Sequence, residues 1–206
     1  MQSVFESGLQ LPKKVCVVAP GPAGKPFYKY IPSDYFVIAV SKAVLIRGLK
    51  AQLWMMNHAA QPWFERASNS FQGLRVFSYS AYKESEKSHA GHCLYTYEPK
   101  EPSLDSSQIL PLTRCIRYGA TVSACAIQLA YHCGAKEILL CGVDLTGAEY
   151  FDGDVNPHPD HQDTWPAVEH LNPLLQKMIK EANICIESLS PTRLNVPVVN
   201  VVQLTI

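Results

Sequence analysis

The chain has 206 residues, with 18 basic and 18 acidic side chains, so its formal net charge is zero. This balance argues against a nucleic-acid-binding protein, which usually carries a basic excess. The length suffices for one substantial core and predicts a single domain over residues 1–206. No run of residues is apolar enough to cross a bilayer, and the first residues lack the pattern of a secretory signal. We therefore expect a soluble, cytoplasmic protein.

Short apolar runs in the first half of the chain predict buried strands at 14–19, 35–40, 51–56 and 74–77. A stretch rich in Ser, Lys, Glu and Pro follows at 78–112, with a short candidate strand at 93–97. It has too few apolar residues to bury a core of its own. We expect it to form an irregular insertion, such as a lid.

The second half begins with a helical pattern. From Thr121 the apolar residues recur at steps of three and four, and Gly134 should end this helix. A continuous apolar strand is expected at 137–143, a helix at 165–182 and a last strand at 184–187. Strands that alternate with helices predict an α/β fold with a mostly parallel, doubly wound, Rossmann-like sheet and helices on both sides.

The seven cysteines include no C-x-x-C pair and lie mostly within apolar runs, as in LeuLeuCysGly. Free cysteines in such runs usually act as small buried apolar groups. We expect buried thiols in a reducing compartment, without disulfides or a zinc site.

Most of the predicted strands are followed by small or polar residues: ProGlyPro, Ser41, Asn57, GlyValAsp and Ser188. Open α/β sheets bind ligands outside the carboxyl ends of their strands, so this edge is the expected functional face. At the end of the strand 137–143, Gly142 would leave room for a ligand and Asp144 could hold a hydroxyl, an amine or a metal ion. The alternative is that Asp144 only caps the following loop.

The turn ProGlyProAlaGly at 20–24 follows the first strand, where nucleotide-binding folds place their phosphate loop. Gly21, Pro22 and Ala23 are therefore candidate nucleotide-binding residues. The pattern is neither GxGxxG nor the P-loop, which disfavours an ordinary dehydrogenase or NTPase, and a plain tight turn is the alternative.

The start of the central helix is a second candidate anion site. Thr121 or Ser123 can cap this helix, and its exposed N–H groups could bind a phosphate. Arg114 and Arg117 precede it and could add positive charge. Capping alone is the alternative for the two hydroxyl residues.

The segment DGDVNPHPDHQD, at 152–163, holds four aspartates and two histidines. His158 or His161 would titrate near neutral pH, so a general base is the first interpretation. A polar loop without chemistry is the second. A metal site is the third, because the spacing matches no recognised metal motif, and we predict no metal ligands.

In this order, the motifs resemble the small bacterial sialyltransferases, which use CMP-sialic acid on a Rossmann-like domain. They are equally similar to a bacterial and phage family of unassigned function, related to the archaeal hydroxymethylpterin diphosphokinases. The resemblance covers about 15–57 and 118–199. Its most recognisable element runs from SerAlaCysAla, at the start of the central helix, to LeuLeuCysGlyValAspLeu.

The resemblance implies nucleotide-site roles for several residues. Ser41 stands where the sialyltransferases have an asparagine, and Asn57 matches a second asparagine near the sugar nucleotide. The family holds the leaving phosphate with two tyrosines; Cys125 falls at one of these positions, and Tyr118 is a candidate substitute without being a match. The remaining matches are Gly21 and Pro22 at the turn, Thr121 and Ser123 at the helix, and Gly142 and Asp144 at the strand end.

The catalytic histidine of the family maps to His161 or, less well, to His158. The implied reaction is transfer of a sugar from a CMP-type donor to an acceptor hydroxyl on a small molecule or glycan, with no required cofactor. One alternative is a diphosphokinase whose Mg²⁺ would be held by carboxylates such as Asp144 and Asp152. Another is a non-catalytic nucleotide-binding phage or accessory protein. The apolar end of the chain could pair between subunits in a homo-oligomer.

Overall fold

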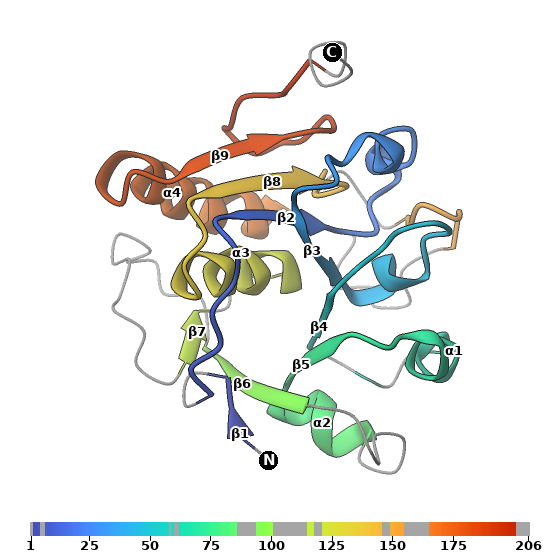
Figure 1. The fold of residues 1–206 in the computed structure, drawn as a ribbon. Helices are drawn as coiled ribbons and strands as arrows, with labels where there is room; N and C mark the ends of the chain where they lie inside the picture. The colour runs from blue at the N-terminus through green and yellow to red at the C-terminus, as the bar shows by residue number, and fades with distance from the viewer. Residues whose placement is uncertain are drawn as a thin grey trace.

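The computed structural model describes residues 2–4, 7–57, 59, 62–85, 94–100, 115–117, 121–145, 149–154 and 165–200 (Figure 1). The strands are β1 (Gln2–Ser3), β2 (Lys14–Val18), β3 (Phe36–Val40), β4 (Leu53–Met56), β5 (Leu74–Ser78), β6 (Leu94–Lys100), β7 (Cys115–Arg117), β8 (Glu137–Cys141) and β9 (Cys185–Ser188). The α-helices are α1 (Phe64–Ser70), α2 (Tyr79–Ser85), α3 (Val122–His132) and α4 (Trp165–Glu181), and the 3-10 helices are η1 (Pro22–Gly24), η2 (Tyr28–Tyr30) and η3 (Ser41–Leu45). Among the helices of these ranges, none has both the length and the apolar character that crossing a membrane requires.

The strands form one nine-stranded sheet in the order β1-β6-β5-β4-β3-β2-β8-β9, with β7 also paired to β6. Every described strand pair is parallel. The chain runs outward from β2 through β3, β4, β5 and β6, and then returns to place β8 on the other side of β2. The strand order therefore reverses between β2 and β8, the switch point at which open α/β sheets bind ligands. The predicted parallel α/β fold is confirmed.

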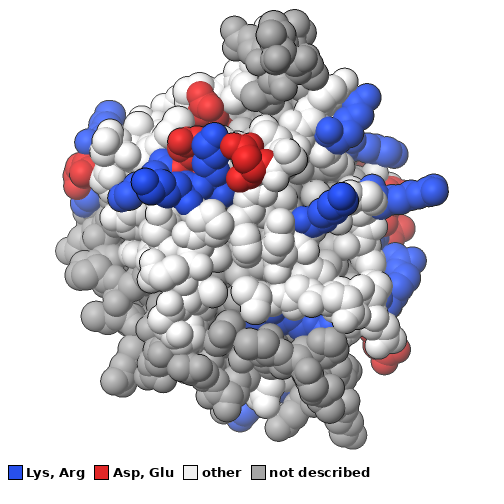
Figure 2. Space-filling view, viewed as in Figure 1, with Lys and Arg blue, Asp and Glu red and all other residues white. Residues whose placement is uncertain are grey.

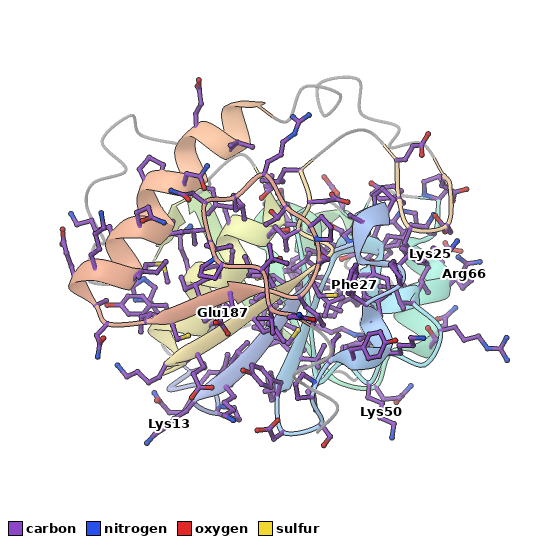
Figure 3. The ribbon with its side chains drawn as sticks, turned by 90° about the horizontal axis from the view of Figure 1, so that it is seen from above. Lys13, Lys25, Phe27, Lys50, Arg66 and Glu187 are labelled. Atoms are coloured by element: carbon purple, nitrogen blue, oxygen red, sulfur yellow. The ribbon has the colours of Figure 1, made fainter. Side chains whose placement is uncertain are left out.

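The two faces of the sheet are covered differently. Alternate residues of a strand point to opposite faces, so Val15 and Val17 enter the core beneath α3 and α4, whereas Cys16 and Val18 enter a second core. That second core is closed by the 3-10 segments that follow β2 and β3, in which Phe27 packs against the sheet. In Figure 3, Phe27 lies among interior side chains, while Lys13 and Lys50, which precede β2 and β4, project outward.

The expected helices on both sides are confirmed, because α3 and α4 cover one face and α1 and α2 pack on the other with Trp54 and Met56 of β4. The connections after β2 and β3, however, are 3-10 turns. The connection after β2 contains Pro20, Pro22, Pro26 and Pro32. Proline has no N–H and clashes with the preceding turn of an α-helix, so closely spaced prolines prevent a long helix here.

The segment 78–112, expected to be an irregular insertion, contains regular structure where it is described. Residues 79–85 form α2, and β6 at 94–100 pairs with β5 as a strand of the main sheet. Residues 86–93 and 101–112 lie outside the described residues. The strand predicted at 93–97 therefore exists and is longer than expected, and it lies next to β5 in the sheet.

The prediction that the cysteines are free and buried is confirmed for four of the described residues. Cys16, Cys125, Cys133 and Cys141 are free and buried. Cys185 is free but exposed, because it begins β9 at the edge of the sheet.

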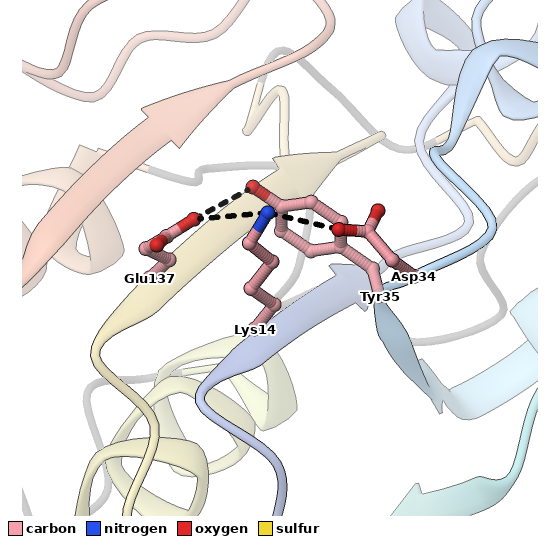
Figure 4. Close-up of polar contacts among 4 residues, drawn as sticks. All are labelled: Lys14, Asp34, Tyr35 and Glu137. Carbon is pink, nitrogen blue, oxygen red and sulfur yellow. Dashed lines mark hydrogen bonds and ion pairs between the residues drawn. The ribbon is translucent and has the colours of Figure 1, made fainter.

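A cluster of charged side chains lies at the amino ends of the central strands, opposite the switch-point edge. Lys14 pairs with Asp34 at 2.8 Å and with Glu137 at 3.8 Å, and Tyr35 donates a hydrogen bond to Glu137 at 3.5 Å (Figure 4). Figure 2 shows basic and acidic side chains gathered together on this face of the molecule. The Lys14 hydrogen bond lowers the pKa of Asp34. Exposed pairs of this kind add little stability.

His132, the last residue of α3, makes stability depend on pH. Its ring lies 4.7 Å from that of Tyr131, and burial lowers its pKa from 6.5 to about 4. The unfolded chain therefore binds this proton at a higher pH than the folded protein does. The contribution of His132 to stability is complete above pH 6.5 and falls as the pH decreases toward 4.

At about 1.4 kcal/mol per pKa unit, we expect this loss to be at most about 3.5 kcal/mol. His132→Gln should remove it, so urea unfolding at pH 7 and pH 4.5 should show a smaller pH difference for the variant than for the wild type. Equal differences for the two proteins would contradict the burial of a neutral imidazole.

Candidate functional site

The ends of β2 and β8 meet at the switch point through the turn Pro20–Gly24 and the segment Gly142–Asp144. The Asp144 carboxylate is 5% exposed and accepts a hydrogen bond from the Ala23 N–H at 2.9 Å. This bond joins two residues that lie 121 positions apart in the chain. Asp144 therefore holds the turn after the first strand against the end of β8, a structural role close to the capping alternative.

Every N–H group of the turn donates within the protein. Its two prolines, Pro20 and Pro22, carry no N–H. The acceptors are the Gly142 carbonyl for Gly21, the Asp144 carboxylate for Ala23 and the Gly21 carbonyl for Gly24, at 3.1, 2.9 and 3.1 Å. A phosphate cradle needs N–H groups directed at the ligand. The N–H groups of this turn already have acceptors within the protein, so they are not directed at a phosphate, and nucleotide binding by Gly21, Pro22 and Ala23 stays a prediction.

The space beside Gly142 is filled by the protein. Gly142 has φ +70°, and a Cβ at this position would clash with the Ala19 carbonyl oxygen and lie 2.9 Å from the Tyr28 hydroxyl. The Tyr28 hydroxyl lies 3.1 Å from both the Ala19 and Gly21 carbonyl oxygens and can donate to either. The room that we expected for a ligand is thus used to pack β2 against β8.

The start of α3 fits an anion site better than the turn does. Thr121 has extended backbone and caps the helix, with its hydroxyl accepting a hydrogen bond from the Ala124 N–H at 3.2 Å. A hydroxyl that accepts this bond keeps its own hydrogen for a second partner. Ser123 lies inside the helix and is 5% exposed, so Thr121 is the capping residue. Arg117 ends β7, whereas Arg114 lies outside the described residues.

Ser41 and Asn57 follow β3 and β4 directly, at the edge predicted to be functional. Ser41 has φ +48°, and its carbonyl accepts a hydrogen bond from the Trp54 indole at 3.0 Å. Asn57 is 7% exposed, and its carbonyl accepts a hydrogen bond from the Ser78 hydroxyl at 2.6 Å. The parallel strands thus bring both residues to one edge of the sheet. The start of α3, capped by Thr121, lies at the same edge, and α3 packs on the core that it forms with β3 and β4.

Sequence reasoning missed Lys42, the residue after Ser41. Its side chain is fully buried at the carboxyl end of β3, where it pairs with Asp152 at 2.6 Å and with Asp154. Its ammonium also lies 5.1 Å from the centre of the Tyr150 ring. The only sequence signal was a lysine two residues after a buried strand and before AlaValLeu.

Asp152, predicted to bind nucleotide or Mg²⁺, is paired with Lys42. Burial acts to raise the pKa of Asp152, but the hydrogen bond from Lys42 and its positive charge outweigh burial and hold the pKa below 3.8. Within the described ranges, no group of three or more His, Cys, Asp or Glu residues is arranged to hold a metal ion. The predicted base His161, its alternative His158, and Tyr118 lie outside those ranges.

No family model matches the chain, and no curated protein matches its sequence. Solved structures do. The sialyltransferase CstII from Campylobacter jejuni bound to CMP has 15% identity and a TM-score of 0.57, over 92% of this chain and 86% of that one. CST-II with a trisaccharide acceptor and CMP has 15% identity and a TM-score of 0.57, over 91% and 86%. The monofunctional α-2,3-sialyltransferase Cst-I from Campylobacter jejuni has 13% identity and a TM-score of 0.57, over 92% and 83%.

These similarities define the fold of the chain as that of the Campylobacter sialyltransferases. They extend over about nine-tenths of its length. The expected resemblance to the sialyltransferases is confirmed at the level of the fold.

Proposed function

We propose that the protein is a glycosyltransferase of the sialyltransferase type, which transfers a sugar from a CMP-sugar to an acceptor hydroxyl of a small molecule or glycan. The observation that carries this proposal is the fold shared with CMP-bound CstII over 92% of the chain. The proposal is further supported by the polar groups at the switch-point edge. We also propose that the protein acts in the cytoplasm and forms a homo-oligomer. The side chain of Val198, which is 56% exposed, could make an apolar contact between subunits.

In this proposal the phosphate of the nucleotide binds at the start of α3. The first N–H groups of a helix have no acceptor within the helix, and its dipole favours an anion there. Thr121 can accept its capping bond and still donate its hydroxyl hydrogen to a phosphate oxygen. Ser41 and Asn57 contact the nucleotide-sugar from neighbouring strand ends. Gly21, Pro22 and Ala23, with Gly142 and Asp144, shape the floor of the site.

The proposed reaction uses a histidine base and no metal. The acceptor oxygen attacks the anomeric carbon while His161 takes the hydroxyl proton, and the bond from that carbon to the phosphate oxygen breaks to release CMP. An alcohol is a poor nucleophile at neutral pH, so a base that titrates near that pH is effective. The charge on the leaving phosphate is stabilised by helix N–H groups and by Thr121.

We expect CMP to stabilise the protein against heat more than CDP, UDP, GDP or ATP does. At a ligand concentration one hundred times the Kd, the stabilisation is about 2.7 kcal/mol, which corresponds to a rise in Tm of about 5–10 °C for a chain of this size. The measurement is a thermal-shift series across the five nucleotides, each with Mg²⁺ and with EDTA.

The same series separates the alternatives. A shift that requires Mg²⁺ and ATP would favour the diphosphokinase over the transferase, because the proposed reaction uses no metal. The absence of a shift with every nucleotide would overturn the proposed function.

A further inference from the structure

We infer that Lys42 is a positioning residue, which fixes the segment Tyr150–Asp154 against the turn after β2 and thereby sets the shape of the nucleotide site. The inference rests on the proposed function for the identity of the ligand. The contacts of Lys42 itself are those of the described structure.

Lys42 anchors the segment by charge. Its fully buried ammonium contacts carboxylates on both sides of Gly153, Asp152 and Asp154, and lies beside the Tyr150 ring. The Asp154 N–H also bonds to the Asp152 carboxylate at 3.3 Å, which closes the acidic residues into one compact group. An ammonium has three donors, so it can hold both carboxylates in a defined arrangement.

The anchored segment in turn holds the turn after β2. The Phe151 N–H donates to the Pro20 carbonyl at 2.7 Å. The Phe151 ring lies edge-on to the Tyr28 ring at 6.3 Å, and the Tyr28 hydroxyl can donate to the carbonyl of Ala19, just before the turn, or to that of Gly21 within it. Lys42, at the end of β3, thus contacts Tyr150 and Asp152, the two neighbours of Phe151 in the chain. Phe151 itself contacts Pro20 and Tyr28, which follow β2.

A buried lysine is costly unless its charge is compensated, and an apolar residue of similar size often stabilises a core as well. We therefore expect the ion pairs of Lys42 to fix the position of the segment rather than to add stability. Its carboxylate partners face outward, with 31% of the Asp152 side chain and 70% of the Asp154 side chain exposed. An ion pair at the border between core and solvent can fix one register of the segment, whereas apolar contacts would allow it to slide.

The test compares Lys42→Met with Lys14→Met. Lys14 also pairs with two carboxylates, but at the opposite edge of the sheet, so its variant should behave like the wild type. In Lys42→Met, hydrogen exchange at the Phe151 amide should accelerate, because the segment is no longer held by charge. The Kd for CMP measured by calorimetry should rise about tenfold, which corresponds to a loss of about 1.4 kcal/mol.

Asp152→Asn provides a second variant in case Lys42→Met does not fold. It leaves the lysine in place, and it should accelerate exchange at Phe151 and weaken CMP binding in the same direction. A double-mutant cycle of Lys42→Met with Phe151→Ala should give a CMP affinity loss smaller than the sum of the single losses, since both changes release the same segment. Additive losses would indicate a separate role for Lys42 and overturn the inference.

Exchange at Phe151 that is unchanged in folded Lys42→Met would also overturn it, as would unchanged CMP affinity in a protein that binds CMP. If the wild type does not bind CMP, the proposed function fails. The exchange measurement still decides, in that case, whether Lys42 holds the segment.

Discussion

Replacement of His161 by alanine is expected to lower kcat by about 10²–10⁴-fold, the usual contribution of a positioned general base. The affinity for CMP should stay nearly unchanged, because the base contacts the acceptor hydroxyl and not the nucleotide. The measurement is steady-state transfer from a CMP-sugar donor to an active acceptor, together with a calorimetric Kd for CMP. A loss of kcat at constant Kd locates the effect in the chemical step.

His158→Ala is the matched control, since His158 lies three residues earlier in the same acidic segment. It should keep most of the turnover. A protein that loses turnover with His158→Ala and keeps it with His161→Ala would show that the base is the other histidine. If neither change affects an active enzyme, a histidine base is wrong for this protein.

Much of the fold could be predicted from the sequence because its central strands are continuous apolar runs. The strands predicted at 14–19, 35–40 and 137–143 differ from β2, β3 and β8 by no more than two residues at either end. The run at 137–143 is cut short because Gly142 turns the chain with φ +70°. The strand predicted at 93–97 matches the half of β6 that pairs with β5, whereas its continuation GluProLys, which contains a proline and two charged residues, was not predicted and pairs with β7.

The location of the site was predictable, but several of its contacts were not. Strand ends can be recognised locally, and parallel strands then bring Ser41, Asn57 and Asp144 to one edge of the sheet. The contact of Asp144 with Ala23 joins residues 121 positions apart, and that of Lys42 with Asp154 joins residues 112 positions apart. Such partners depend on how the loops pack. For this reason, the turn after β2 looked like a phosphate loop although its N–H groups already had acceptors.

Replacement of Gly142 by alanine is expected to destabilise the fold by about 2–5 kcal/mol. An L-residue in the left-handed region costs about 1–2 kcal/mol, and insertion of a methyl group into a filled space adds about 1–3 kcal/mol. Here the added Cβ would clash with the Ala19 carbonyl oxygen, which belongs to the backbone and cannot rotate away as a side chain does. The measurement is urea unfolding of the wild type and the variant under identical conditions.

Gly8→Ala separates the two causes. Gly8 has φ +66°, close to the +70° of Gly142, but a Cβ there would meet nothing within 4 Å. It should therefore show only the conformational cost of about 1–2 kcal/mol. The excess loss in Gly142→Ala measures how tightly the ends of β2 and β8 are packed at the switch point. Equal losses in the two variants would mean that Ala19 can move aside, and that the ligand space first expected beside Gly142 can open.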